Sequence, residues 1–135
     1  MIRVLIVDGQ AQVRWGLRMR LAIEPDISVV GETGTAVEAV ALARATHPDV
    51  IVADIGIRNA DGVNMVRCLR TAAPHAAVVV LTLHGDKDTR AQAQEAGAQA
   101  FLEKSGGATD LLQAIREFAE RPTTAPLAAP HLLVG

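Results

Sequence analysis

The stretch VLIVDGQ, residues 4–10, joins a short aliphatic run to a single carboxylate and a glycine. Two further runs of the same kind are VIVA, residues 50–53, and VVVL, residues 78–81. Short apolar runs bounded by polar or turn residues are typical of strands buried on both faces of a parallel sheet. Two weaker runs, ISVVGE at 27–32 and AFL at 100–102, predict strands nearer the sheet edges.

Helical patterns lie between these strands. The clearest repeats every fourth residue at Val13, Leu17 and Leu21 and must stop near Glu24, because the proline that follows disfavours helical geometry before it. Segment 86–97 is rich in Ala and Gln and poor in large apolar residues, so it predicts the least firmly held helix, ending at its glycine. Three further helices are predicted. A capping box of Thr35 and Glu38 opens a helix that carries Val37, Val40 and Ala41, and Asp61-Gly62 leads into a helix with Val63, Val66 and Leu69. Thr109 and Asp110 suit the cap and first turn of a last helix, with Leu111, Ile115 and Phe118 on one face.

Strand and helix alternate five times along the 135 residues, a length that suits one domain. This alternation predicts an α/β fold with an open, doubly wound, five-stranded parallel sheet. The strand order that we expect is the flavodoxin-like 2-1-3-4-5. Periodicity ends near Glu120, and the prolines that follow predict a linker or tail. We expect a domain over residues 1–121 and a Pro-rich tail over 122–135.

Composition narrows the class of protein. The net charge is −2, from 13 basic and 15 acidic residues spread along the chain, which disfavours direct binding to nucleic acid or to a membrane surface. Cys68 is the only cysteine, so no internal disulfide is expected, in keeping with a reducing compartment. The chain opens directly into a strand without a signal-peptide pattern, and we expect it to be cytoplasmic.

Chemistry-bearing residues stand at four predicted strand ends: Asp8, Asp54, Thr82 and Lys104. Ligands of such sheets bind outside the carboxyl ends of the strands, where the strand order reverses. Taken singly, each residue is more often a turn former, a cap or a solvated side chain. Together, two acids, a hydroxyl and a lysine predict a site for a divalent cation and a phosphoryl group.

These residues resemble the receiver domain of two-component response regulators. The resemblance runs from Ile2 to about Glu120 and rests on VLIVD, PDVIVADIGIRNADG, VVVLT and EAGAQAFLEK. The wording IRVLIVD, VRWGLRMRL and EPDISVVGE is most similar to the NarL/FixJ subfamily, whose full-length members carry a LuxR-type DNA-binding domain. No such output domain is recognisable within the printed sequence.

The resemblance implies a role for each matching residue. Asp54 matches the phosphoacceptor, which receives the phosphoryl group from a sensor histidine kinase or a small phosphodonor. Thr82 matches the hydroxyl that turns toward that group, and Lys104 matches its lysine partner. Phe101 matches the aromatic switch that follows the hydroxyl inward, although a phenylalanine at this place is equally often a plain core residue.

The resemblance also implies Mg²⁺, with the carboxylates of Asp8 and Asp54 and the carbonyl of Gly56 as ligands. The family usually has a second acid after the first strand, and Gly9 stands there instead. Losing even an outer metal partner commonly lowers affinity by about 10- to 100-fold, so we expect weakened Mg²⁺ binding. Arg58, in the loop after Asp54, is either an ordinary solvated arginine or a partial replacement for the missing cation.

The expected function is therefore a phosphorylation-gated switch that controls an output through dimerisation or domain docking, with transcription the expected output. The alternative is a pseudo-receiver that acts as an interaction or dimerisation module without phosphorylation, because Gly9 replaces an acidic ligand. We expect no enzymatic activity: DGQAQVR lacks a flavodoxin's hydroxyl-rich phosphate loop, and Gln10 stands where a haloacid dehalogenase phosphatase has its second aspartate.

Trp15 falls off the stripe of the first helix and is predicted to be exposed. It either packs partly on Met19 or serves as an anchor for a dimer or partner surface, where tryptophan is enriched. The four histidines have no ligand spacing and are expected in loops, with His84 near the mouth of the site.

Overall fold

The computed structural model describes residues 1–56, 61–83, 85, 87–104 and 108–120. Strands and helices alternate in this part of the chain, as the sequence predicts. The strands are β1 (Ile2–Val7), β2 (Ile27–Thr33), β3 (Val50–Asp54), β4 (Ala77–Thr82) and β5 (Ala100–Glu103), and the helices are α1 (Ala11–Ala22), α2 (Ala36–Thr46), α3 (Gly62–Ala72), α4 (Lys87–Ala96) and α5 (Ala108–Glu120).

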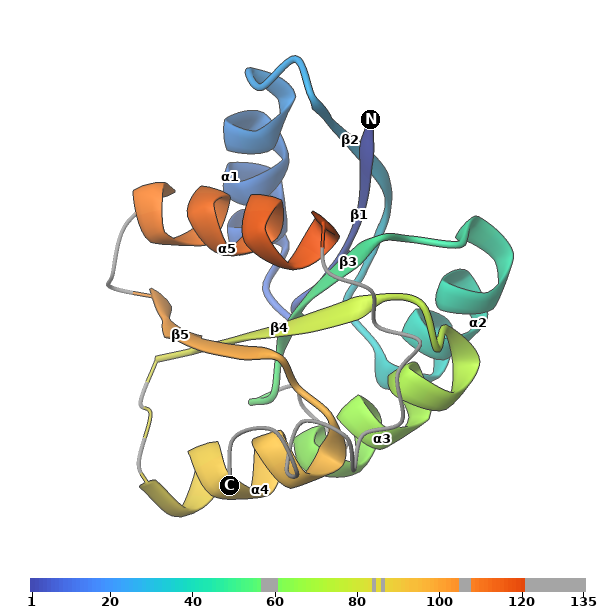
Figure 1. The fold of residues 1–135 in the computed structure, drawn as a ribbon, viewed down its shortest axis with the longest axis vertical. Helices are drawn as coiled ribbons and strands as arrows, with labels where there is room; N and C mark the ends of the chain where they lie inside the picture. The colour runs from blue at the N-terminus through green and yellow to red at the C-terminus, as the bar shows by residue number, and fades with distance from the viewer. Residues whose placement is uncertain (57–60, 84, 86, 105–107, 121–135) are drawn as a thin grey trace.

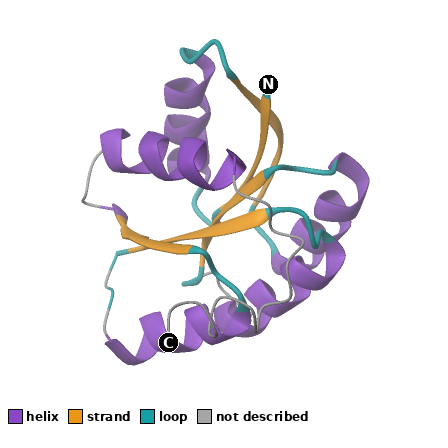
Figure 2. Cartoon of the chain, viewed as in Figure 1, coloured by secondary structure: helices purple, strands orange, loops and turns teal. Residues whose placement is uncertain are grey.

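The strands form one parallel sheet of order β2-β1-β3-β4-β5, which confirms the predicted topology and puts the two weaker strands at the edges. Helices α1 and α5 cover one face of the sheet, and α2, α3 and α4 cover the other (Figure 1). The sheet therefore lies as a central layer between two helical layers (Figure 2). Chain order and strand order differ at β1, so β1 and β3 are neighbours at the reversal point.

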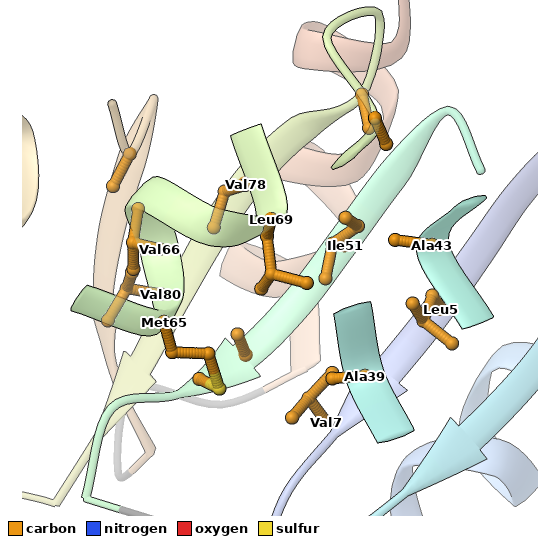
Figure 3. Packing of buried hydrophobic residues seen from close by; sticks show 14 of the residues in the cluster. Leu5, Val7, Ala39, Ala43, Ile51, Met65, Val66, Leu69, Val78 and Val80 are labelled. Carbon is orange, nitrogen blue, oxygen red and sulfur yellow. The ribbon is translucent and has the colours of Figure 1, made fainter. Parts of the chain in front are cut away.

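Alternate residues of the central strands enter two separate cores. Leu5, Ile51 and Val78 point to the α2–α3–α4 face, where they share one cluster with Ala43 of α2 and Leu69 of α3 (Figure 3). Their sequence neighbours point the other way, toward α1 and α5. The buried residues of this second core are Val4, Ile6, Ile27, Val50, Val52, Val79 and Leu81 of the strands, with Leu21, Leu111, Ala114 and Ile115 of the helices. Burial on both faces explains the unbroken apolar runs.

The helix boundaries confirm most of the sequence signals. Helix α1 ends at Ala22, just short of the predicted stop, and Asp61 caps α3 by accepting a hydrogen bond from the Asn64 amide. Gly97, directly after α4, has a φ of +114°, which glycine adopts readily. Helix α5 begins at Ala108, one residue before Thr109, so the expectation that Thr109 is the cap residue is wrong. Asp110 lies in the first turn, as predicted.

Helix α2 departs from the expected pattern. Val37 is 85% exposed and Ala41 is exposed, whereas Ala39 and Ala43 are buried against the sheet. Small side chains let the helix backbone lie close to the strands, so the buried stripe is made of alanines. Thr35 accepts a hydrogen bond from the Glu38 amide, which confirms its half of the capping box.

Candidate functional site

The carboxyl ends of the parallel strands bring the predicted site residues to one edge of the sheet. Asp8 directly follows β1, Asp54 is the last residue of β3, and Thr82 is the last residue of β4. The register pairs Val7 with Ala53, so Asp8 and Asp54 come next to each other on adjacent strands. Lys104 directly follows β5 and reaches back across β4 toward them.

Lys104 bridges the two carboxylates. Its Nζ lies 2.8 Å from Asp8 Oδ2 and 3.1 Å from Asp54 Oδ2. The lysine side chain is 12% exposed, that of Asp54 14% and that of Asp8 only 1%. Three of the sequence-predicted residues therefore form one compact cluster, in which Asp54 is the more accessible acid.

Backbone amides hold the other oxygen of each carboxylate. The Gln10 amide donates to Asp8 Oδ1 at 2.9 Å, and the Gly56 amide donates to Asp54 Oδ1 at 2.9 Å. Both are local turns in which an aspartate caps the backbone that follows it. The Oδ1 atoms are thereby fixed, and the Oδ2 atoms face Lys104.

Electrostatics favour the charged lysine. Burial by itself lowers the pKa of Lys104, but its contacts with Asp8 and Asp54 outweigh this and hold the pKa above its ordinary value. Lys104 therefore remains an ammonium at neutral pH and offsets one of the two negative charges beside it. The cluster keeps one net negative charge when both acids are ionised.

The described donor set tests the fit of a divalent cation. Asp8 Oδ2 is buried, and although it lies close to Lys104 it receives no hydrogen bond of good geometry within the described residues. Gly9 contributes no side chain. No group of three or more His, Cys, Asp or Glu side chains converges among the residues that the structure describes. The two carboxylates are hard oxygen donors of the kind that Mg²⁺ prefers, and the described residues offer fewer acids than a three-acid site.

Arg14 is a supporting residue that the sequence reasoning missed. Its Nη1 donates to the backbone carbonyl of Asp8 at 2.7 Å, and its Nε donates to Glu32 Oε1 at 3.3 Å. A Cβ added at Gly34 would stand 2.8 Å from this Nη1, so Gly34 makes room for the guanidinium. Arg14 thus fixes the peptide that carries Asp8. In the sequence, Arg14 is marked only as a charged residue next to the apolar Val13 in α1.

Thr82 and Phe101 lie on the β4–β5 side of the site. Thr82 is 8% exposed, and Phe101 is partly buried against the core on the α2–α3–α4 face. Gly85, which the sequence reasoning did not single out, lies between them. A Cβ added there would stand 2.8 Å from Phe101 Cε1 and 3.6 Å from Thr82 Cγ2. The predicted hydroxyl and the predicted aromatic switch are therefore neighbours through this glycine.

Other residues singled out from the sequence lie apart from the cluster or outside the described part of the chain. Trp15 is 59% exposed and Met19 43%, which confirms the predicted exposed tryptophan. Of the histidines, His47 is exposed directly after α2. Arg58, His84 and His131 lie outside the described residues.

The fold and the cluster define a class: flavodoxin-like domains with a lysine-bridged carboxylate pair at the carboxyl edge of the sheet. The chain belongs to the response regulator receiver domain family, whose model matches residues 4–116. It is a receiver domain of two-component systems. This match favours a phosphorylation-dependent receiver over the pseudo-receiver alternative. Receiver domains typically bind Mg²⁺ for phosphorylation, receive phosphate from histidine kinases and often dimerise.

Transcription regulators of the LuxR/NarL type are prominent among the relatives. The chain is 37% identical over 116 residues to the transcriptional regulatory protein LiaR of Bacillus subtilis (strain 168), covering 86% of this chain and 55% of LiaR. A two-component response regulator of the LuxR family from Aurantimonas sp. SI85-9A1 has a similar structure, with a TM-score of 0.82 and 33% identity over 89% of this chain and 86% of that one.

A second similar structure is a response regulator protein from Burkholderia pseudomallei with a phosphorylated aspartic acid and a calcium ion. Its TM-score is 0.75, with 26% identity over 88% of this chain and 69% of that one. Other relatives are named protein-glutamate methylesterases, and the chain covers 38% of such a protein. The chain thus spans only about half or less of these curated relatives. Within the described residues, no helix has the length and apolarity needed to cross a membrane.

Proposed function

We propose that this receiver accepts a phosphoryl group on Asp54. The observation that carries the proposal is the difference between the two acids: both contact Lys104, but the Asp54 side chain is 14% exposed and that of Asp8 is 1%. A phosphodonor reaches Asp54 more easily. A carboxylate oxygen of Asp54 attacks phosphorus, the bond from phosphorus to the donor's leaving group breaks, and an aspartyl phosphate forms. Lys104 offsets the charge of the transferred group.

Mg²⁺ would be held by the carboxylates of Asp8 and Asp54 and the carbonyl of Gly56. When bound, it supplies positive charge that stabilises the phosphoryl group during transfer. Because Gly9 replaces an acidic ligand, we expect this chain to bind Mg²⁺ about 10- to 100-fold more weakly than a variant with an acid there.

The partners follow from this role. We propose a sensor histidine kinase or a small phosphodonor as the source of phosphate, and a conformational change through Thr82 and Phe101 as the response. The response then controls dimerisation or an output domain, with transcription as the controlled process in the cytoplasm. The receiver would span residues 1–121, with 122–135 as a Pro-rich linker or tail and with no enzymatic activity in this chain.

Intact mass after incubation with Mg²⁺ and acetyl phosphate tests the site. Wild-type protein is expected to gain the mass of one phosphoryl group, and Asp54→Asn to gain none. The exposed acid Asp88 on α4 gives the control: Asp88→Asn should be modified like the wild type. Wild type and Asp54→Asn behaving alike would overturn the assignment and favour the pseudo-receiver.

Restoring the missing acid tests the metal assignment. Among the described residues only Gly97 is a glycine with positive φ, so Gly9→Asp meets no left-handed backbone strain. We expect Gly9→Asp to lower the Mg²⁺ concentration for half-maximal binding by about 10- to 100-fold, measured by titration calorimetry. Gly16→Asp adds the same charge on the exposed side of α1 and should leave binding unchanged. Equal affinities in the wild type and Gly9→Asp would refute a metal site beside Asp8.

A further inference from the structure

The ring of Phe101 is held by two elements outside the carboxylate cluster. Arg90 of α4 places its guanidinium carbon 5.2 Å from the ring centroid, within the range of a cation–π contact. Gly85 lies at the ring edge, where an added Cβ would stand 2.8 Å from Cε1. The ring thus has a charged group over it and a close backbone approach beside it.

The same glycine leads back to the site. The position of its absent Cβ lies 3.6 Å from Thr82 Cγ2. Thr82, Gly85 and Phe101 therefore form a continuous row from the end of β4 to β5, and Arg90 extends it to α4.

The first half of helix α4 has no buried side chain among the described residues. Its buried residues are Ala93 and Ala96, both in its second half, whereas Arg90 lies in the first half. Among the described residues no ion pair joins Arg90 to a carboxylate. Within the described residues the ring is a partner of this guanidinium, and the contact ties the first half of α4 to β5.

We propose that Arg90 is the positioning residue of Phe101. In the resting protein the Arg90 guanidinium holds the Phe101 ring against Gly85. This contact must break before the ring can follow Thr82. The link to signalling rests on the proposed switch role of Phe101. The resting contact itself does not depend on phosphorylation.

The test uses the resting protein with 4-fluorophenylalanine at both phenylalanines and ¹⁹F NMR, with Phe118→Leu assigning the two resonances. Arg90→Gln is expected to shift the Phe101 resonance and to raise hydrogen exchange of the α4 amides on the order of 2- to 5-fold. Arg90→Lys keeps a cation and should restore both values at least in part. Arg67→Gln, the same change at an exposed position inside α3, is the matched control and should alter neither.

An Arg90→Gln spectrum and exchange pattern indistinguishable from those of Arg67→Gln would overturn the proposal. A response that Arg90→Lys does not restore at all would also overturn it, because the cation would then not be the cause. Adding acetyl phosphate separates this inference from the proposed function. A phosphorylated wild type with an unchanged Phe101 resonance refutes the switch role while the resting measurement still decides the role of Arg90.

Discussion

Helices α3 and α4 lie on the same face of the sheet but are attached to it very differently. Helix α3 buries Met65, Val66 and Leu69 in the core, whereas α4 buries only Ala93 and Ala96. A buried Leu or Val side chain contributes about 1.5–3 kcal/mol relative to an exposed one, and an alanine methyl contributes much less. The firmly anchored helix follows β3, which carries Asp54, and the weakly anchored helix precedes β5, which carries Phe101.

The difference between the two helices separates the part of the molecule that carries the carboxylate cluster from the part that we expect to move. Asp8 directly follows β1 and Asp54 ends β3, both in the middle of the sheet, and their oxygens are fixed by backbone amides and Lys104. Helix α4 can change its position at a lower cost in buried apolar area. A receiver needs both properties, a fixed site and an element whose two positions differ little in free energy.

The largest effect is expected when the α3 anchor is removed. Leu69 is fully buried, so Leu69→Ala should lower the free energy of unfolding by about 2–5 kcal/mol through lost burial and the cavity left behind. Ala93→Gly in α4 should cost only about 1 kcal/mol, mostly through helix propensity. Urea denaturation of both variants measures the contrast. Similar losses in the two helices would break the comparison.

A smaller effect is expected at Gly97, where the end of α4 meets α3. Its φ is +114°, and an added Cβ would stand 2.8 Å from Cγ of the largely buried Arg70. Gly97→Ala should therefore destabilise the protein by about 1–3 kcal/mol. Gly16, inside α1 with nothing within 4 Å of an added Cβ, is the matched control, and Gly16→Ala should stabilise by about 0.5–1 kcal/mol. Thermal unfolding that gives both changes the same sign would contradict the structure.

A pH-dependent effect is expected at Lys104, which ties β5 to the two acids. Because its folded-state pKa is raised above the ordinary 10.5, its stabilising contribution is fully present below that value and is lost as the pH rises through the folded-state pKa. The difference in unfolding free energy between the wild type and Lys104→Met should stay constant from about pH 7 to 9 and shrink above 10.5. A difference that grows with alkaline pH would reverse the expected sign.

The fold was predictable because its strands carry a signal that few other structures produce. Runs such as 50–53 and 78–81 are apolar at every position because both faces of the sheet are covered. The buried face of helix α2 was less predictable. Its buried residues are Ala39 and Ala43, and in a helix with alanines on several sides the sequence does not show which alanines face the core.

The site was predictable as far as it rests on strand ends. The positions of Asp8, Asp54 and Lys104 follow from where strands stop, and the parallel sheet then brings them together. The contacts of Arg14 and Arg90 were not predictable, because an arginine on a helix is usually solvated and only the packed structure shows what its guanidinium meets. Gly85 likewise carries no signal until the ring of Phe101 lies beside it.

Hydrogen exchange of the phosphorylated protein tests the central claim most directly. Wild-type protein is treated with Mg²⁺ and acetyl phosphate, its phosphorylation is verified by intact mass, and exchange is compared with the untreated protein. We predict a change of severalfold in peptides from α4 and β5, residues 87–103, and no change in α3, residues 62–72. Phosphorylated protein with unchanged exchange in α4 and β5, or with an equal change in α3, would contradict the account.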